Sequence, residues 1–464
     1  MKTLTAVVLF SGFVTWGLTA PVSAAASAPE SLRVLVPNGG WCWFQDERAI
    51  LVGDTVVFGS VKSPSGDVDA HAWNPLTGAV RTFTLAPQHE SDDHNVPAFL
   101  ALPDGRILAS WGNHGRVEPK EHNQRLWWRR TERPGDISAW EPTASLPHPA
   151  GVTYTNLYRL SAENGRIYNF SRSIAFNPNY TVSEDGGRTF RYGGRLLSWG
   201  QPETQDPKST RATGGGRPYV KYASNERDTV HVLTTEDHPG AYQNSIYHGF
   251  VQGGSVFTSE GKAVAPLSRT EETAVKPTDL TRIYQGDADH VAWTVDLHLD
   301  ADERPVAVFS VQHHGASVQD QRIATGMDLR YYYARHDGTR WQVHPLAYAG
   351  TELYGAESDY SGLVAIVPHQ PERVFISTNS DPVSGRPLVS ATDGQRHYEI
   401  FSGLTADGGA TWTWTPVTRN SAADNLRPIV PIGDRLGTVV LWLRGTMRTF
   451  RDYDFEIVGY VAPN

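Results

Sequence analysis

Two histidines beside a group of carboxylates are the residues of this chain best suited to proton-transfer chemistry. One lies in Asp92–Asn95, and the other ends Trp111–His114, twenty residues after the first. The apolar stretches between them flank Pro103–Arg106, which contains Asp-Gly, and this pattern predicts a β-hairpin. A hairpin brings its open ends together, so we expect His94 and His114 to be neighbours. Paired imidazoles next to carboxylates can accept and donate protons near neutral pH.

The elements that would position this hairpin are strands throughout. Short runs rich in Val, Ile, Tyr, Phe and Thr, such as 55–58 and 229–233, alternate with Asp-Gly, Asn-Gly and Gly-Gly turns. This spacing predicts an all-β protein, for which a sandwich, a β-helix and a propeller are all possible architectures.

A repeated octet narrows this choice to a propeller. Ser183–Phe190 fits the Asp-box pattern Ser-x-Asp-x-Gly-x-Thr-aromatic, and Thr405–Trp412 fits it with Thr in place of Ser. Such an octet forms a tight turn between the outer strands of a blade, with its aromatic residue packed beneath. The length suits six to eight blades, and we predict seven four-stranded blades. Apolar segments at 438–442 and 455–460 could close the ring by pairing with N-terminal strands.

The N-terminus and the composition indicate where the protein works. Residues 1–24 have the pattern of an export signal, with Lys2, an apolar run and small residues before the expected cleavage site. No later segment has the apolar length of a membrane span. We therefore expect a protein that is secreted or periplasmic and not bound to a membrane, with residues 25–464 as one domain. The single cysteine, Cys42, excludes an intrachain disulfide and a cysteine-rich zinc site.

Charge and aromatic content favour a glycan over a nucleic acid as the partner. The chain has 41 Lys and Arg against 50 Asp and Glu, a formal net charge of −9, and so lacks the overall positive field of a nucleic-acid-binding protein. Its 14 Trp and 19 Tyr are residues that carbohydrate-active proteins use as flat platforms for sugar rings. An anionic substrate would have to be attracted by a local cluster of Arg and His.

The histidine hairpin, the Asp boxes, the opening segment Gly40–Asp46 and the segment Asn244–His248 together resemble a known family. They are similar to the BNR-repeat (Asp-box) polysaccharide lyases, which include ulvan lyases and rhamnose-α-1,4-glucuronate lyases and are related to propeller α-L-rhamnosidases. The resemblance covers nearly the whole mature chain. It implies a seven-bladed β-propeller with its active site on one face near the axis, and cleavage of a rhamnose-glucuronate linkage by β-elimination.

Such an elimination sets three chemical requirements. The uronate carboxylate must be neutralised, a base must remove the C5 proton, and an acid must protonate the leaving oxygen. In the family two hairpin histidines, a tyrosine and an arginine do this work. The resemblance carries these roles to His94 and His114, with His114 as the base, and to Arg172 as the carboxylate ligand. It does not separate Tyr158 from Tyr154, and we assign Tyr158 to catalysis and Tyr154 to substrate binding.

Further side chains lie where the substrate could be bound. The expected strands and loops place four more polar or aromatic candidates near the catalytic set: Asn113, Arg217, Tyr219 and His248. We expect an acidic polysaccharide or oligosaccharide as the partner, and a monomeric protein. No cofactor is required by this chemistry. Whether a metal is bound stays open, and a structural Ca²⁺ is possible.

Two other functions remain open at the level of the sequence. One is a propeller α-L-rhamnosidase that hydrolyses a rhamnosyl-glucuronate linkage. Hydrolysis normally uses a pair of carboxylates, and no distinctive pair stands out, which favours elimination. The other is a glycan-binding propeller without catalytic activity, for which His94 and His114 would be dispensable.

Overall fold

The computed structural model describes residue 1 and residues 32–115, 124–148, 150–199, 216–240, 242–267, 275–313, 328–354, 359–433 and 435–463. The predicted export signal, apart from Met1, lies outside these ranges. Within them, no helix is both long enough and apolar enough to cross a membrane.

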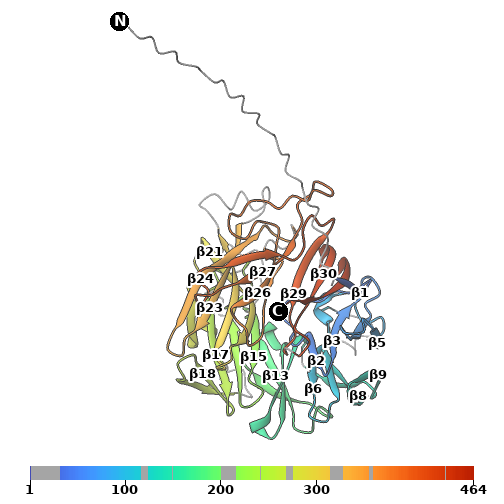
Figure 1. Cartoon of the computed structure of the whole chain (residues 1–464). Helices are drawn as coiled ribbons and strands as arrows, with labels where there is room; N and C mark the ends of the chain where they lie inside the picture. The colour runs from blue at the N-terminus through green and yellow to red at the C-terminus, as the bar shows by residue number, and fades with distance from the viewer. Residues whose placement is uncertain are drawn as a thin grey trace.

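Seven antiparallel sheets form the blades of a β-propeller, as predicted (Figure 1). The first strand named for each blade below packs beside the first strand named for a neighbouring blade. Two blades carry more than four strands in the described part of the chain. The blades are blade 1, β2 (Ala49–Val52), β3 (Thr55–Val61), β4 (Val68–Trp73) and β5 (Val80–Ala86); blade 2, β6 (Ala98–Ala101), β7 (Ile107–Trp111), β8 (Arg125–Arg133), β9 (Asp136–Trp140) and β10 (Ala144–Pro147); blade 3, β11 (Thr153–Leu160), β12 (Arg166–Arg172), β13 (Pro178–Ser183) and β14 (Arg191–Arg195); blade 4, β15 (Val220–Ser224), β16 (Thr229–Thr234), β17 (Ile246–Gln252), β18 (Ser255–Thr258), β19 (Ala263–Pro266) and β20 (Thr281–Tyr284); blade 5, β21 (His290–Leu299), β22 (Pro305–His313), β23 (Asp328–His336) and β24 (Trp341–Gly350); blade 6, β25 (Val364–Ile366), β26 (Arg373–Thr378), β27 (Glu399–Leu404) and β28 (Thr413–Pro416); and blade 7, β29 (Asp424–Ile429), β30 (Thr438–Thr449), β31 (Asp452–Ala462) and β1 (Arg33–Val36).

Blade 7 closes the ring with strands from both ends of the chain. The N-terminal strand β1 pairs antiparallel with the C-terminal strand β31, so that Arg33 lies opposite Gly459 and Val34 opposite Val458. This confirms the predicted closure for the segment 455–460, whereas the segment 438–442 lies in β30 and pairs with β29 and β31. The pairing uses the open edge of the last sheet and joins the two ends of the chain through backbone hydrogen bonds.

Both Asp boxes form the predicted turns between the third and fourth strands of blades 3 and 6. In the first, the Asp185 carboxylate accepts hydrogen bonds from the backbone and hydroxyl of Thr189. In the second, Asp407 accepts the same two bonds from Thr411. The aromatic residue reaches the preceding blade: the Phe190 ring lies 5.0 Å from that of Trp128 in blade 2. Each box therefore stabilises its own turn and also a contact between blades.

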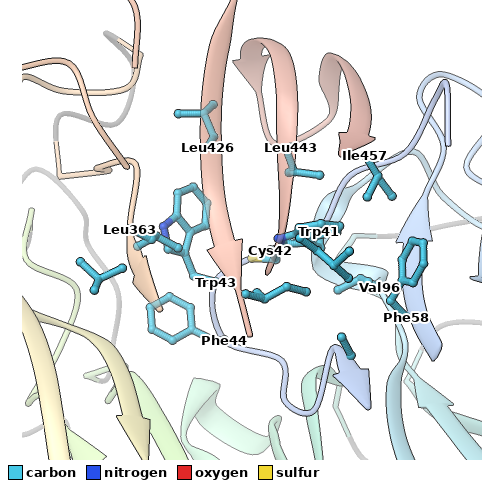
Figure 2. Close-up of a cluster of buried hydrophobic side chains, with 14 of the residues drawn as sticks. Trp41, Cys42, Trp43, Phe44, Phe58, Val96, Leu363, Leu426, Leu443 and Ile457 are labelled. Carbon is cyan, nitrogen blue, oxygen red and sulfur yellow. The ribbon is translucent and has the colours of Figure 1, made fainter. Parts of the chain in front are cut away.

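The linker between β1 and β2 fills the centre of the propeller. Trp41, Cys42, Trp43 and Phe44 are all buried, and Figure 2 shows them between side chains of blade 7, such as Leu426 and Leu443, and side chains of blades 1 and 2. The Phe44 ring lies 5.3 Å from that of Tyr154, 4.9 Å from that of Tyr219 and 5.5 Å from that of Trp293. This segment forms an apolar base beneath the residues that the sequence marked for chemistry.

Candidate active site

The predicted hairpin brings the two histidines into contact. Strands β6 and β7 pair directly, from Ala98 opposite Ser110 to Ala101 opposite Ile107. The 3₁₀ turn η1 (Asp93–Asn95) precedes β6 and carries His94, while His114 follows β7. Their imidazole rings stack with centroids 3.9 Å apart and planes 12° apart.

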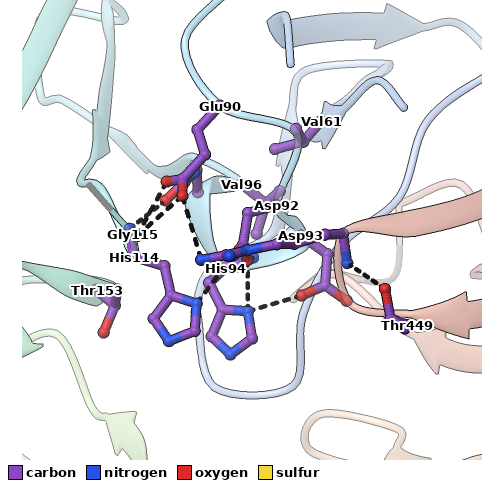
Figure 3. Close-up of polar contacts among 12 residues, drawn as sticks. Val61, Glu90, Asp92, Asp93, His94, Val96, His114, Gly115, Thr153 and Thr449 are labelled. Atoms are coloured by element: carbon purple, nitrogen blue, oxygen red, sulfur yellow. Dashed lines mark hydrogen bonds and ion pairs between the residues drawn. The ribbon is translucent and has the colours of Figure 1, made fainter. Parts of the chain in front are cut away.

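One buried carboxylate holds both rings. Asp92 accepts a hydrogen bond from Nδ1 of His94 at 2.7 Å and from Nδ1 of His114 at 2.9 Å (Figure 3). Because an ionised carboxylate can only accept, each Nδ1 must carry a proton. Both rings point away from Asp92 in the same direction, with their Nε2 atoms leading (Figure 3). A neutral ring in this arrangement has its Nε2 lone pair available.

The surroundings make one histidine of the pair positively charged and leave the other neutral. Burial would lower the pKa of His94, but the groups around it, Cys42 and Asp92 among them, outweigh burial and raise that pKa well above its usual range. Burial and the neighbouring positive charge of His94 lower the pKa of His114 to about 4. At neutral pH, His94 is therefore an imidazolium and His114 a neutral base. The side chain of His114 is 25% exposed and that of His94 only 4%, so His114 is the more accessible of the pair.

Two arginines from blade 7 complete the polar cluster beneath the histidines. Nη1 of Arg427 lies 2.6 Å from Oδ2 of Asp93, whose other oxygen lies 2.9 Å from Nδ1 of His94. Nε of Arg451 lies 3.0 Å from Oδ2 of Asp92. Burial would raise the pKa of Asp92, but the charges of His94 and His114 and their hydrogen bonds hold it well below its usual range. The ionised Asp92 in turn favours the positive charge on His94.

A β-bulge turns Tyr154 towards His94. In the β11–β12 ladder, Thr153 lies opposite Arg172 and Asn156 opposite Phe170, so β11 contains one extra residue between these pairs. Tyr154 adopts a left-handed backbone with φ 58°, and its carbonyl accepts a hydrogen bond from Nδ2 of Asn156. The Tyr154 ring lies 5.2 Å from that of His94. Burial raises the pKa of Tyr154 above its ordinary value, so its hydroxyl is protonated at neutral pH.

Arg172 supplies a buried cation next to Tyr154. Its guanidinium carbon lies 4.3 Å from the centre of the Tyr154 ring, and Nε donates to Oγ1 of Thr153 at 3.0 Å. Nη1 donates to the hydroxyl of Tyr219 at 3.4 Å. Among the residues that the structure describes, no carboxylate forms an ion pair with Arg172. A buried guanidinium without an anionic partner is suited to bind an anion from outside the chain.

The structure separates two predicted residues from this cluster. The hydroxyl of Tyr158 donates to the carbonyl of Tyr222, and its ring packs in an apolar cluster between blades 3 and 4 that does not contain Tyr154. Both ring nitrogens of His248 are engaged inside blade 4, Nε2 with His231 and Nδ1 with Ser259. The bulge explains why Tyr154 and not Tyr158 lies beside the histidines. In a regular strand the two side chains would point to the same face, and the extra residue breaks this alternation.

The remaining substrate-binding candidates are Asn113, Tyr219 and Arg217. Asn113 is buried, and its side-chain oxygen accepts a hydrogen bond from the Trp127 indole. Tyr219 lies against Arg172, as described above. Arg217 lies two residues before Tyr219, and its guanidinium carbon is 5.9 Å from the centre of the Phe176 ring. Asn113 directly precedes His114, its Nδ2 is buried without a hydrogen-bond partner in the described structure, and its role in substrate binding stays a prediction. Tyr219 and Arg217 lie along one side of the site.

Sequence reasoning missed the contribution of the C-terminal hairpin. The Phe450 ring lies 5.1 Å from that of His94 and 5.4 Å from that of His114, and Arg451 binds Asp92. Both residues lie at the turn between β30 and β31, and Arg451 is 359 positions from Asp92 in the chain. No local pattern could indicate this contact, because it depends on the closure of the ring.

Two overlapping groups of side chains have ligand atoms close enough to hold a metal ion. They are Cys42, Asp93 and His94, and Asp92, His94 and His114. The Nδ1 atoms and the carboxylates of these groups already have partners within the chain: both Nδ1 atoms bind Asp92, and the carboxylates pair with Arg427 and Arg451. A cation here would compete with two arginines, so these groups fit a proton-transfer site better than a metal site. The structural Ca²⁺ stays a prediction.

Comparisons with known proteins agree with the fold. A solved PL25 ulvan lyase bound to -[GlcA(1-4)Rha3S]- aligns with a TM-score of 0.64 at 17% identity, covering 91% of this chain and 94% of that one. The polysaccharide lyase Uly1 aligns with a TM-score of 0.55 at 10% identity, covering 96% and 95%. At these identities the likeness concerns the fold alone. No curated protein matches the chain. A family model described as a BNR repeat-containing family member matches residues 59–349, well over half of the chain, and the protein therefore belongs to the BNR repeat-containing family.

Proposed function

We propose that this protein is a secreted polysaccharide lyase that cleaves the bond to O4 of a uronate, at a rhamnose-glucuronate linkage, by β-elimination. The observation that carries this proposal is the stacked pair His94 and His114 on one carboxylate, beside a buried Arg172 that has no acidic partner in the described chain. The solved relative of similar fold that is bound to -[GlcA(1-4)Rha3S]- supports the choice of a uronate.

Two cations in this site can neutralise a substrate carboxylate. The Arg172 guanidinium can bind it through paired N–H donors, and the imidazolium of His94 adds a second positive charge near the same Tyr154 ring. Neutralising the carboxylate stabilises the negative charge that develops when the C5 proton leaves. The chemistry therefore requires no metal or cofactor.

Proton removal and proton donation fall to His114 and Tyr154. Neutral His114 takes the C5 proton on Nε2, and the electrons of that C–H bond form the C4=C5 double bond. The C4–O4 bond breaks with its electron pair on the leaving oxygen, which accepts the proton of the Tyr154 hydroxyl. The raised pKa of Tyr154 keeps this proton in place until the oxygen leaves. His114 thus gains one proton and Tyr154 loses one, so the net charge of the site and substrate together is unchanged.

Hydrolysis fits this site less well than elimination. A hydrolase of the usual kind uses one carboxyl group as the acid and a second as the nucleophile or base. The two carboxylates of this cluster, Asp92 and Asp93, are buried and bound to histidines and arginines. They are therefore not available to a water molecule or to a sugar carbon.

The pH profile should reflect the opposite charge states of the two histidines. His114 acts as a base only when neutral, so kcat/KM should fall on the acidic side as pH drops through about 4. His94 acts as a cation, and because its pKa is raised, activity should persist through neutral pH and fall only as His94 loses its proton in the alkaline range. Initial rates measured from acidic to alkaline pH test this. An acidic limb near the ordinary histidine pKa of about 6.5 would contradict it.

The central experiment compares two tyrosine variants. Wild type, Tyr154→Phe and Tyr158→Phe are incubated with ulvan, and the ultraviolet absorbance of unsaturated uronates is followed. We expect product from the wild type, a loss of roughly 10²-fold or more in Tyr154→Phe, and near-normal rates in Tyr158→Phe. Tyr158→Phe removes one buried hydrogen bond of similar chemistry and is the matched control.

The products distinguish the competing functions. Free rhamnose from a rhamnosyl-glucuronate glycan, without any unsaturated uronate, would replace the lyase by a hydrolase. Binding without any product would leave a glycan-binding propeller. Equal losses in both tyrosine variants would remove Tyr154 from the acid role.

A further inference from the structure

An exposed aromatic side chain lies close in sequence to the buried arginine of the site. Phe176 ends the 3₁₀ turn η4 (Ile174–Phe176), which connects β12 to β13, four residues after Arg172. Its side chain is 53% exposed, which makes it one of the few large apolar residues that the described structure leaves in solvent.

The backbone around Phe176 is held in an unfavourable conformation. Ala175 and Phe176 have consecutive positive φ angles of 55° and 58°, a region that residues with a β-carbon adopt at a cost in free energy. The turn is fixed by backbone hydrogen bonds from Ser173 to Asn177 and from Phe176 to Ser173. The Ser173 hydroxyl also bonds to Nδ1 of His148 at 2.7 Å. Strain of this kind persists where the surrounding structure imposes it, and it is frequent at ligand-binding sites.

Arg217 faces this ring from the neighbouring blade. Its guanidinium carbon lies 5.9 Å from the centre of the Phe176 ring. The Nε atom of Arg217 is buried and makes no hydrogen bond within the described structure. No acidic group among the described residues forms an ion pair with this guanidinium, so its charge is available to an external anion. An aromatic face can pack against the ring of an acidic sugar, and a guanidinium without an acidic partner in the described part of the chain can bind the sugar's anionic group.

This pair is continuous with the catalytic cluster. Both pairs bridge blades 3 and 4: Nη1 of Arg172 reaches the hydroxyl of Tyr219, and the Arg217 guanidinium reaches the Phe176 ring. Arg172 and Phe176 are joined by one short turn, and Arg217 and Tyr219 are separated by a single proline. A polymer bound at Arg172 would therefore place an adjoining sugar unit near Phe176 and Arg217.

We propose that Phe176 and Arg217 form a second saccharide subsite, which binds an anionic sugar unit next to the one that is cleaved. The sugar ring packs on the phenyl face, and its carboxylate or sulfate ester binds the guanidinium. For the identity of the polymer, this inference rests on the proposed function. The strained turn at Ala175 and Phe176 would serve to hold the phenyl ring exposed to solvent.

The subsite predicts a change in KM that depends on substrate length. Phe176→Ala should raise KM for ulvan roughly three- to ten-fold, as expected for one lost ring contact, with kcat changed less than about two-fold. Arg217→Gln should raise KM by about ten-fold or more, as expected for a lost charge-assisted bond. Both effects should shrink for a substrate too short to reach the subsite. Phe176→Tyr, which keeps the ring, should retain the wild-type KM.

Matched controls and a binding measurement make the test decisive. Leu76→Ala removes another exposed apolar side chain, and Arg419→Gln removes an exposed arginine away from the site; neither should change KM. Calorimetry of ulvan oligosaccharides in a His114→Ala background measures the subsite without turnover, and a desulfated sample separates a sulfate from a carboxylate as the ligand of Arg217. Unchanged affinity in both Phe176→Ala and Arg217→Gln would overturn the subsite. If the wild type showed no turnover but Phe176→Ala and Arg217→Gln still lost affinity, the lyase proposal would be overturned and the subsite would stand.

Discussion

Replacement of His114 by alanine is expected to abolish the lyase activity and to leave the fold intact. His114 is the only histidine of the stacked pair that is neutral at neutral pH, because burial and the His94 charge lower its pKa to about 4. Loss of a positioned general base costs roughly 10²- to 10⁴-fold in rate. The side chain is partly exposed, so its removal leaves no large cavity. The measurement is the rate of unsaturated uronate formation at saturating ulvan, together with the thermal unfolding midpoint.

His290→Ala is the matched control for this prediction. His290 is also a partly exposed histidine bound to an aspartate, with Nδ1 lying 3.1 Å from Oδ1 of Asp287, and it lies at the start of β21. Its replacement should leave the rate unchanged. If His114→Ala kept more than about a tenth of the wild-type rate, the base would have to be sought elsewhere, with Tyr154 as the next candidate.

Replacement of Arg427 by methionine is expected to have the largest effect on stability. Arg427 is fully buried, pairs with Asp93 at 2.6 Å, and has its guanidinium carbon 3.6 Å from the centre of the Trp43 ring. Methionine fills much of the same volume but leaves the Asp93 carboxylate buried without its cation. Breaking a buried pair in this way typically costs about 3–5 kcal/mol. Urea unfolding of the two proteins measures the difference in the free energy of unfolding.

A second arginine of blade 7 provides the comparison. Arg444 pairs with Glu456 between β30 and β31, and both side chains are about one third exposed. Arg444→Met should lower the free energy of unfolding by no more than about 1 kcal/mol, the usual range for a solvent-exposed pair. Equal losses in Arg427→Met and Arg444→Met would show that the Asp93 pair does not hold blade 7 against the centre of the propeller.

Local sequence patterns were sufficient to predict the propeller fold and the contact between the two histidines of the site. The period of the strands, the Asp-Gly turns and the two Asp boxes depend on neighbours in sequence, so they could be predicted without coordinates. The contact between His94 and His114 belongs to the same class, because a hairpin determines which residues meet at its ends. The pairing of the two chain ends followed from their apolar strands and from the need to cover sheet edges.

The arrangement around the histidines was decided only by the tertiary structure. One extra residue in β11 turns Tyr154, and not Tyr158, towards His94, and a bulge leaves no clear mark in the sequence. Arg427 and Arg451 reach Asp93 and Asp92 only because ring closure brings blade 7 beside blade 1 and its connection to blade 2, which carries these two aspartates. The sequence by itself therefore determined the propeller and its histidine pair. Ring closure and strand register decided which tyrosine and which arginines surround that pair, because these contacts join segments that no local pattern relates.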